Sequence, residues 1–562
     1  MFLPTTQAEL QAYGWTALDV VLVTGDSYID SPFIGAAVIA RVLYDAGFRV
    51  GIIAQPDVSS GRDIARLGEP RLFWGVTGGS VDSMVANYTA TGRKRRSDDF
   101  TPGGRNDRRP DRAVIVYGNL IRRHFKNTRP IVLGGVEASL RRVAQYDFHS
   151  DKIRRSILFD AKADYLLYGM ADQSVVALAQ RLRDNTPVDD MRGVCYIAGE
   201  ATPDVIELPS FDAVAADHQA FTDMFRVFYQ NNDHITGRTL AQRQDTRYLI
   251  QNPPPPPLSQ RALDRVHELD YQLEQHPFYQ KRGQVKALET IKFSLVTHRG
   301  CYGECNFCGI TVHQGWTVTW RSAASIVREA RRLVRRPDFK GIISDVGGPT
   351  ANMYGFECKK KLTNGMCPDK RCLHPEVCRT LKVDHNPQLE LLRKLRGIEG
   401  VRKVFVASGL RHDMVLADRR HGHAYLNELV GHHVSGQLKL APEHSEDSVL
   451  NLMGKPGRQA LVEFRRLFLE ATRRAGKKQY LTYYLIAAHP GCSDADMMKL
   501  KDFVGSVLKL NPQQVQVFTP LPSTWSAVMY HTGKDPFTGR SLSVVKDIAG
   551  KVRQKRIVQG DR

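Results

Sequence analysis

The sequence predicts an α/β protein with two folded parts: a doubly wound parallel-sheet domain over residues 1–200 and a partial (β/α)6 barrel over residues 287–530. Short apolar runs alternate with segments of helical spacing in both parts, which is typical of parallel sheets whose strands are buried on both faces. Six such runs occupy the second part, and nearly all end in glycine or polar residues, as strands do at the ligand-binding edge of α/β barrels. At 562 residues, the chain also exceeds the roughly 250–300 residues at which one hydrophobic core stops growing.

The first domain begins with a strand, a helix and a second strand. Val20–Thr24 is an apolar run, Gly35–Asp45 has helical spacing, and Phe48–Ala54 is the next apolar run. Three further strands are expected, at residues 113–117, 130–133 and 165–168. In an open sheet of this kind, the space for a ligand lies at the carboxyl ends of the strands.

Two other segments have weak periodicity. Residues 201–286 include five consecutive prolines at 253–257, a stiff extended run, so we expect a connector between the two folded parts. Residues 531–562 are polar and basic, and we expect them to form a tail.

The barrel is expected to have its strands at residues 291–296, 341–344, 403–407, 434–440, 480–486 and 514–518. Helices are expected between them at residues 325–336, 387–395, 414–430, 458–474 and 494–508. A cysteine-rich insertion at 355–385 follows the second strand.

The net charge of +20 favours a polyanion as partner, such as RNA, DNA or the ribosome, although solubility alone is the alternative. Eleven cations crowd one stretch with few aromatic residues, which indicates contact with phosphates rather than bases. They are Arg93, Lys94, Arg95, Arg96, Arg105, Arg108, Arg109, Arg112, Arg122, Arg123 and Lys126. No run of about 18 apolar residues and no signal peptide is found, so we expect no membrane span and a cytoplasmic location.

Seven of the nine cysteines lie between residues 301 and 378, and such clustering in a cytoplasmic chain indicates metal binding rather than disulfides. Cys301, Cys305 and Cys308 have C-x3-C-x2-C spacing, directly after a predicted strand. Close thiolates on one loop suit a 4Fe–4S cluster, and three ligands leave the fourth iron open. A zinc site or buried structural cysteines are the alternatives, but structural zinc usually takes four ligands.

With an aromatic residue before its last cysteine, this motif resembles the signature of radical S-adenosylmethionine (SAM) enzymes. The resemblance implies that the open iron binds the amino and carboxylate groups of SAM. An electron from the cluster then cleaves SAM to methionine and a 5′-deoxyadenosyl radical. It also implies that Phe307 lies near the adenine, whereas simple core packing is the alternative for this ring.

Other residues at the strand ends resemble superfamily positions less closely. Gly347 and Gly348 lie where the family has its GGE motif, but Pro349 replaces the glutamate, so only the role of the glycine turn is implied. Ser408 and Glu443 resemble polar residues that contact the ribose and methionine of SAM, with helix capping as the alternative. Arg411 is a candidate partner of the SAM carboxylate, or an exposed surface arginine. The segment 486–491 resembles the one that packs on adenine.

The whole chain is similar to the YgiQ-type radical SAM proteins, over roughly residues 10–530. The stretches that carry this similarity are 296–308, 345–355, 440–444 and 133–142. This family resemblance does not name a substrate.

Four further cysteines lie in the insertion, among many lysines and arginines. They are Cys358, Cys367, Cys372 and Cys378, at spacings that match no strong signature. No apolar core is apparent around them, so a metal could order the segment, and both zinc and an auxiliary iron–sulfur cluster stay open. Cys195 and Cys492 stand alone and are interpreted as packing residues.

The first domain resembles the cobalamin-binding domain of one radical SAM subgroup, whose D-x-H-x-x-G motif supplies the histidine that ligates cobalt. Asp30 and Gly35 match that motif, but Pro32 stands in the histidine position and has no ligand atom. We therefore do not expect histidine-ligated cobalamin, while binding without a protein ligand stays open.

The leading hypothesis is an enzyme that generates a 5′-deoxyadenosyl radical and takes a hydrogen atom from a substrate. The basic stretch favours RNA or a ribonucleoprotein as that substrate, and a donor such as flavodoxin or ferredoxin would supply the electron. A second hypothesis is a radical SAM methyl- or methylthio-transferase that uses a second SAM, cobalamin or an auxiliary cluster. A third is a non-catalytic iron–sulfur protein that binds nucleic acid or senses redox state.

Overall fold

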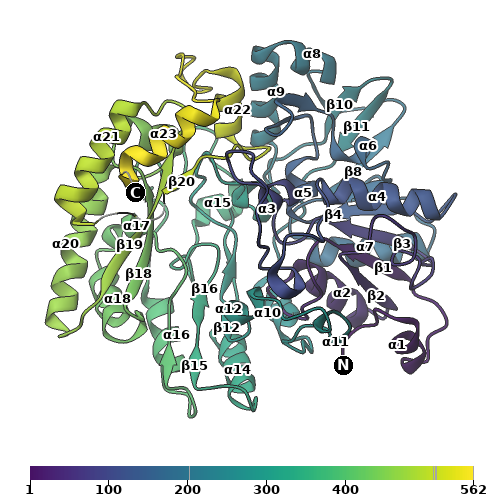
Figure 1. Ribbon diagram of the computed structural model, residues 1–562, viewed down its shortest axis with the longest axis horizontal. Coiled ribbons are helices and arrows are strands. Elements are labelled where there is room, and N and C mark those ends of the chain that lie inside the picture. Colours follow the sequence, from purple (N-terminus) through teal and green to yellow (C-terminus); the bar gives the residue numbers. More distant parts are fainter. Residues whose placement is uncertain (202, 511, 513–514, 561–562) are drawn as a thin grey trace. The chain divides into compact units, whose positions relative to one another are not determined.

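The computed structural model describes residues 1–201, 203–510, 512 and 515–560 (Figure 1). It divides into two compact units. The first unit contains residues 1–258 and 265–292, and the second contains residues 259–264 and 293–562.

The first unit is built on a nine-stranded sheet with the order β2-β1-β3-β4-β7-β8-β11-β10-β9. Its strands are β1 (Val20–Thr24), β2 (Val50–Ala54), β3 (Phe73–Thr77), β4 (Ile131–Gly134), β7 (Tyr165–Leu167), β8 (Val194–Ala198), β9 (Ile206–Leu208), β10 (Leu240–Gln244) and β11 (Arg247–Gln251). The first five strands of the sheet are parallel, and β1 is valine-rich and buried at all five positions. From β1 the chain steps to one side to form β2 and to the other to form β3, so the topology switches between β1 and β3. This is the doubly wound arrangement that the sequence predicts.

The helices of the first unit are mostly short. They are α1 (Gln7–Ala12), α2 (Gly35–Asp45), α3 (Ser83–Asn87), α4 (Ala113–His124), α5 (Gly135–Leu140), α6 (Ile157–Asp160), α7 (Asp172–Arg183), α8 (Phe211–Ala216), α9 (His218–Gln230), α11 (Pro277–Gln280) and α12 (Ala287–Ile291). Helix α2 packs against α7 and β2, whereas α4 packs against β3.

The strand expected at residues 113–117 is wrong, because this apolar run is the first part of α4. Its buried positions, which include Ala113, Val114, Tyr117 and Leu120, recur at helical spacing. A short apolar run cannot by itself distinguish a buried strand from a buried helix. The third parallel strand is instead β3, which the sequence reading missed.

The connector expected at residues 201–286 is wrong over its first half, because β9, β10 and β11 extend the sheet there. Buried glutamines give β10 and β11 a polar pattern in the sequence. Gln242 Oε1 accepts a hydrogen bond from the Ala144 N–H at 3.0 Å, and Gln244 Oε1 accepts one from the Ser156 N–H at 2.9 Å. Satisfied in this way, a buried amide side chain costs little, but it interrupts the apolar pattern.

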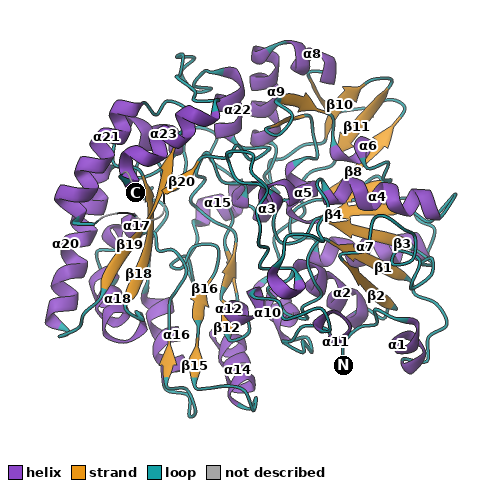
Figure 2. Ribbon diagram, in the orientation of Figure 1, coloured by secondary structure: helices purple, strands orange, loops and turns teal. Residues whose placement is uncertain are grey.

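Among the described residues, the second unit carries six main strands that follow one another in parallel. Helices flank them (Figure 2). The strands are β12 (Ser294–Val296), β16 (Asp345–Gly347), β17 (Lys403–Val404), β18 (Gln437–Glu443), β19 (Tyr480–Ala487) and β20 (Val515–Val517). Strand β12 pairs with β16, and β15 (Ile342–Ile343), just before β16, pairs with β17. A parallel bridge joins Leu410 to Leu440, and β18, β19 and β20 form one sheet. The predicted partial barrel is therefore confirmed, and Gln514, the expected start of its last strand, lies outside the described residues.

The helices of the second unit follow these strands. They are α13 (Ile310–Gln314), α14 (Ala323–Val334), α15 (Lys359–Asn364), α16 (Asn386–Arg396), α17 (His412–Ala417), α18 (Gly422–Glu428), α19 (Asp447–Met453), α20 (Arg458–Arg474), α21 (Asp494–Phe503), α22 (Trp525–Thr532) and α23 (Ile548–Gln559). The single helix expected at 414–430 is two helices, since the Asp418 carboxylate binds the backbone N–H groups of Arg420 and His421. The expected tail at 531–562 is also wrong, because α23 packs against α21 and β20.

Within the part of the chain that the structure describes, no helix is both long and apolar enough to cross a membrane.

Candidate functional site

The three motif cysteines lie on one loop, just beyond β12 and the short β13 (His298–Arg299). The Cys301 sulfur accepts a hydrogen bond from the Gly303 N–H at 3.3 Å. A Cβ atom placed on Gly303 would lie 3.2 Å from the Cys301 sulfur and 3.5 Å from the Cys305 sulfur. Both thiols therefore face the same glycine, which leaves room between them.

The environment of Cys301 and Cys308 disfavours their thiolate forms unless a metal binds them. Burial, together with smaller contributions from the neighbouring Cys305 and Cys301, raises the pKa of the Cys308 thiol to about 12. Burial and Cys305 also raise the pKa of Cys301. Because iron–sulfur ligands must be deprotonated, a bound cation would supply the missing compensation.

Asn306 fixes the loop from three directions. Its N–H and its Nδ2 donate to the Met453 and Leu452 carbonyl oxygens, at 2.9 and 2.8 Å. Its own carbonyl accepts the Ser526 N–H at 2.8 Å, and its Oδ1 accepts Arg371 Nη1 at 2.7 Å. The loop is thus anchored to α19, α22 and the cysteine-rich insertion.

Arg411 is buried beside the thiols and is not an exposed surface arginine, which corrects the alternative reading. Its Nη1 lies 3.9 Å from the Cys305 sulfur. Asp413 holds the guanidinium through two hydrogen bonds of 2.8 and 2.6 Å. Burial would raise the pKa of Asp413, but the charge and hydrogen bonds of Arg411 outweigh it and lower that pKa to about 2. The guanidinium of this buried ion pair therefore stands next to the Cys305 thiol.

The glycine turn after β16 packs tightly on the strand ends. A Cβ on Gly348 would lie 2.7 Å from the His298 carbonyl oxygen, so only glycine fits there. A Cβ on Gly347 would lie 3.5 Å from the Ser408 side chain, so the two predicted positions are neighbours. The Ser408 hydroxyl donates to the carboxylate of Asp345, which also accepts the Ser408 N–H at 3.2 Å. The sequence reading did not single out Asp345 as a residue that positions Ser408.

Glu443 lies at the end of β18 in strained backbone. Its φ of +70° is left-handed, and the register of β18 against β19 shifts between Leu440 and Glu443. Such strain in a non-glycine residue is concentrated at functional sites. The side chain is buried, and this raises its pKa against the opposing effects of Lys455, whose Nζ is 3.9 Å away, and Arg411.

Phe307 lies edge-on to His489, with their ring centroids 6.5 Å apart. His489 belongs to the 486–491 segment beyond β19, and its Nε2 lies 2.8 Å from the Ser526 hydroxyl. The structure thus places Phe307 against the segment 486–491, which the family resemblance predicts to pack on adenine.

The four insertion cysteines gather around one small cavity, which the cluster-motif residue Glu304 also lines. All four are free thiols. Cys378 and Cys358 lie 3.0 and 3.8 Å from the Thr380 hydroxyl. The expectation that no apolar core surrounds them is wrong, because Tyr302, Phe356 and Leu373 are among the buried residues packed beside Cys358.

In the first unit, the switch point between β1 and β3 is closed by the chain itself. A Cβ on Gly25 would lie 2.1 Å from the Gly78 carbonyl oxygen, so the two loops that follow these strands touch. The buried Asp26 carboxylate accepts hydrogen bonds from Arg109 Nη2 and from the Ser80 N–H, both at 2.6 Å. Charged side chains therefore fill the edge where an open α/β sheet would hold a ligand.

The loop after β1, which contains Asp30 and Pro32, is also covered. Asp30 is buried, pairs with Arg41 and accepts the Gln272 N–H at 3.0 Å. The Leu273 N–H donates to the Asp30 carbonyl at 2.9 Å. A neighbouring stretch of the same unit thus occupies the side of this loop on which Asp30 lies.

Asp384, Asp418 and His421 form a compact polar group whose ligand atoms all lie within 4.8 Å of one another. Each has a protein partner. Asp384 contacts His421 Nδ1 at 2.8 Å, and Asp418 contacts His385 Nδ1 at 2.9 Å. Burial would raise the pKa of Asp418, but hydrogen bonds from His385 and from backbone N–H groups outweigh it and lower that pKa strongly. The group acts as a structural junction between α16, α17 and α18.

Because the folded-state pKa of Asp418 is lowered, its contribution to stability is complete above the unfolded value of about 4 and is lost as the pH falls below it. We expect Asp418→Asn to cost about 1.5–3 kcal/mol at pH 6, the usual value of hydrogen bonds to a charged group. The difference from the wild type should shrink towards pH 2. Urea unfolding midpoints of both proteins at pH 6, 4, 3 and 2 check this, and a gap that stays constant with pH would contradict it.

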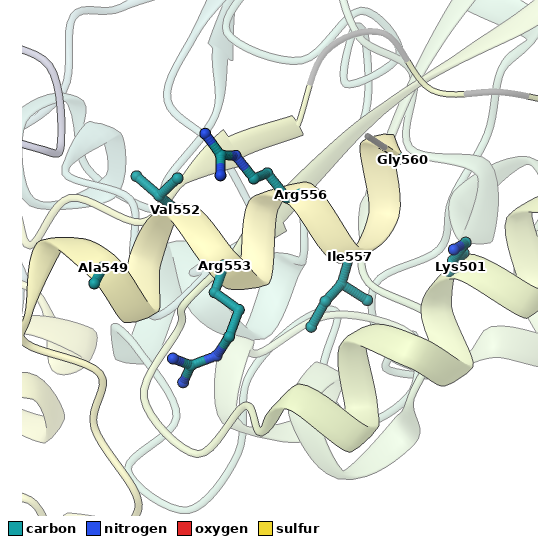
Figure 3. Close-up of a pocket in the computed structure, with 7 residues that line it drawn as sticks. All are labelled: Lys501, Ala549, Val552, Arg553, Arg556, Ile557 and Gly560. Carbon is teal, nitrogen blue, oxygen red and sulfur yellow. The ribbon is translucent and has the colours of Figure 1, made fainter. Parts of the chain in front are cut away.

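An open cleft lies along α23 (Figure 3). Its lining residues are Lys501, Ala549, Val552, Arg553, Arg556, Ile557 and Gly560. Arg553 is engaged by Asp494 at 2.7 Å. None of the predicted cysteines, glycines or polar strand-end residues contributes to this cleft.

Comparison with known proteins shows the superfamily and the family to which the chain belongs. A family described as Radical SAM N-terminal matches residues 2–294, which places the chain among radical SAM proteins. A UPF0313 protein of Fusobacterium nucleatum is 53% identical over 562 residues, which is 100% of this chain and 99% of that protein. A UPF0313 protein of Thermotoga maritima is 49% identical, over 99% of this chain and 97% of its own length. The chain belongs to the UPF0313 family, the YgiQ-type radical SAM proteins.

Two solved structures share the fold at low identity. The radical SAM methyltransferase TsrM from Kitasatospora setae, solved with cobalamin and a [4Fe-4S] cluster, has a TM-score of 0.50 and 14% identity. That match covers 90% of this chain and 74% of TsrM. The cobalamin-dependent SAM radical enzyme OxsB, solved with aqua-cobalamin and SAM, has a TM-score of 0.50 and 10% identity, over 88% of this chain and 53% of OxsB. These likenesses show the two-part fold.

Proposed function

We propose that the chain is an enzyme that binds a 4Fe–4S cluster through Cys301, Cys305 and Cys308 and cleaves SAM reductively. When bound, such a cluster supplies one electron to the sulfonium of SAM, which gives methionine and a 5′-deoxyadenosyl radical. The radical then takes a hydrogen atom from a substrate. The observation that carries this proposal is the group of thiols around Gly303 with the buried Arg411 beside it, at the end of a parallel strand.

The residues around the thiols have distinct roles in this proposal. Arg411, locked by Asp413, offsets the negative charge that three thiolates bring into a buried site. Gly347 and Gly348 let the backbone approach closely where a side chain would block it. Ser408, aligned by Asp345, offers a polar atom at the third strand end, and Glu443 offers a carboxylate for a ribose diol. Phe307 provides an aromatic edge for adenine.

The test is an anaerobic assay. Protein purified and reconstituted with iron and sulfide is reduced with dithionite and mixed with SAM, and 5′-deoxyadenosine is measured by chromatography. We expect 5′-deoxyadenosine to form. If the reconstituted protein holds its cluster but forms no 5′-deoxyadenosine with dithionite or with a stronger reductant, the proposal that it is an enzyme is overturned. That result would favour a non-catalytic iron–sulfur protein.

A one-electron donor such as flavodoxin or ferredoxin fits this chemistry as the partner that supplies the electron. Replacing dithionite by either reduced protein in the same assay tests that partner directly.

RNA is the substrate class that the surface charge supports. Three cations of the basic stretch are used within the fold, since Arg109 is buried against Asp26, while Arg112 and Arg122 pair with aspartates at 2.6 Å. The exposed cations are Arg93, Lys94, Arg95, Arg96, Arg105, Arg108, Arg123 and Lys126. Backbone bridges between Tyr88 and Lys94 and between Ser97 and Arg105 hold the loop in a defined shape. The basic loop thus presents cations on an ordered surface, as phosphate binding requires.

We expect replacement of Lys94, Arg96, Arg105 and Arg108 by alanine to weaken RNA binding. Each lost phosphate contact lowers the slope of log K against log salt by about 0.7 for single strands, so four contacts would lower it by about 3. Fluorescence anisotropy with a single-stranded RNA at several salt concentrations measures this slope. The control variant replaces four exposed cations of the second unit, namely Arg331, Arg335, Lys340 and Lys394. Equal losses in both variants, or wild-type binding that does not depend on salt, would contradict the role of this loop.

Two features of the first unit support a reaction without cobalamin, which the solved TsrM and OxsB structures contain. The switch point is filled by Asp26 and Arg109, and the loop that holds Asp30 and Pro32 is covered. We therefore propose that the reaction proceeds without cobalamin in this domain.

The corresponding prediction is that the wild-type protein, mixed with hydroxocobalamin and passed through a desalting column, retains none of it. The visible absorbance of the eluted protein measures the retained cobalamin. The experiment is done before reconstitution with iron, because an iron–sulfur cluster absorbs in the same range. Stoichiometric retention of cobalamin would contradict the closed switch point and would favour the methyltransferase reading.

A further inference from the structure

The cavity among the insertion cysteines has the composition of a metal site. Cys358, Cys367, Cys372 and Cys378 come from a segment with a single short helix, α15, yet all four reach the same cavity. The Cys378 N–H donates to the Cys372 carbonyl at 2.8 Å, which brings the last two cysteines together through their backbone. Cys358 packs against the apolar core described above, but the convergence of four free thiols on one cavity makes all of them candidate metal ligands.

The spread of these sulfurs does not fit a single zinc ion. Zinc with Zn–S bonds of about 2.3 Å holds its sulfurs less than about 4.6 Å apart. Among the described residues, Asp384, Asp418 and His421 form the only group of metal-binding side chains whose ligand atoms all lie within 4.8 Å of one another. No three of the four sulfurs meet this limit. The three motif cysteines do not meet it either, as expected of thiolates that bind separate irons of one cluster.

The charges around the cavity would offset a cluster with four thiolates. Lys361, Lys370 and Arg371 line the cavity. Lys361 is buried, where its Nζ contacts Glu357 at 2.9 Å and lies 4.6 Å from the centre of the Tyr302 ring. Glu357 balances the charge of Lys361, so Lys370 and Arg371 supply the further positive charge at this cavity that a cluster with four thiolates would need.

We propose that Cys358, Cys367, Cys372 and Cys378 bind a second iron–sulfur cluster, of the four-iron type. This inference does not rest on SAM cleavage, since it concerns only these four cysteines and their surroundings.

The second cluster would lie next to the first. Glu304, which lies between Cys301 and Cys305 in the motif, lines the second cavity. Arg371 of the insertion donates to the Glu304 carbonyl at 3.1 Å and to Asn306 Oδ1 at 2.7 Å. A single loop therefore separates the two groups of sulfurs, and the insertion fixes the conformation of that loop.

The test counts iron, sulfide and zinc after anaerobic purification and reconstitution. The variant without the first site is Cys301→Ala with Cys305→Ala and Cys308→Ala. We expect it to keep about four irons and four sulfides per chain. After reduction it should also show the electron paramagnetic resonance signal of an iron–sulfur cluster. The wild type should hold about twice that iron.

Two further variants complete the experiment. The variant with all four insertion cysteines replaced by alanine should hold about half the iron of the wild type, if circular dichroism shows it folded. The matched control, Cys195→Ala with Cys492→Ala, removes thiols outside both groups and should keep the full content. Loss of all iron from the variant without the first site would overturn the proposal, whatever the folding of the other variant. One zinc per chain in place of that iron would overturn it equally.

Discussion

The variant with alanine at Cys301, Cys305 and Cys308 is expected to form no 5′-deoxyadenosine above background. Loss of outer partners of a metal site alone costs about 10–100-fold, so the loss of every ligand should exceed that range. The measurement is 5′-deoxyadenosine formed per chain from SAM under dithionite, in the wild type and in the variant. The Cys195→Ala variant is the control, because Cys195 lies in β8 of the first unit, outside the motif and the insertion.

Residual 5′-deoxyadenosine at the wild-type rate in this variant would show that another site cleaves SAM. That result would contradict the assignment of the motif even if the second cluster proved to be present. Iron counts in the same samples separate the two questions, since they do not depend on SAM.

The second large effect is expected from Arg109→Met in the first unit. Arg109 is buried and pairs with Asp26 at 2.6 Å and with Asp98 at 3.2 Å. Removing one partner of a buried ion pair costs about 3–5 kcal/mol, because the carboxylates stay buried without compensation. Hydrogen exchange of the β1 amides, read by mass spectrometry, reports opening of this unit separately from the second.

The cost of Arg109→Met should depend on pH. Burial already raises the pKa of Asp26 despite Arg109, so the folded state of the variant takes up a proton more readily than the unfolded chain. Stability of the variant relative to the wild type should therefore recover as the pH falls from 8 towards 5. Arg122→Met is the control, since its pair with Asp164 has the same 2.6 Å distance but is partly exposed and worth about 0–1 kcal/mol. Equal destabilisation by the two variants would contradict the role of burial.

Elements whose pattern is local could be predicted from the sequence. The sequence reading gave β1, α2 and α20 with the bounds that the structure has. The run at 113–117 could not be assigned in this way, because five apolar residues fit a strand and a helix equally well and tertiary packing decides between them. The buried glutamines of β10 hid a strand, since their partners, Ala144 and Ser156, are far away in the sequence.

The residues of the candidate site also divide into those that a local sequence pattern predicts and those that only the structure reveals. The three motif cysteines lie within eight residues, so their spacing alone indicates a cluster. The supports of that motif are long-range contacts, such as Asn306 with Ser526 and Arg371 with Glu304, and no local pattern reveals them. Asp413 could have been proposed from the sequence as a partner of Arg411, because it lies only two positions further along the chain. Its two hydrogen bonds to the guanidinium are known only from the structure.

The division of the chain into units limits how the protein can be dissected. Residues 259–264 belong to the second unit, although the chain returns to the first unit for residues 265–292. The Asp264 carboxylate accepts the Ser322 N–H at 2.8 Å, and helix α10 (Gln260–Glu268) spans the boundary. No single cleavage point therefore yields two complete halves: a fragment ending at 258 lacks the return segment, and one starting at 293 lacks the piece that holds Ser322. Fragments of this protein should therefore keep α10 intact, for instance in a circularly permuted chain, and should not be cut at the proline run.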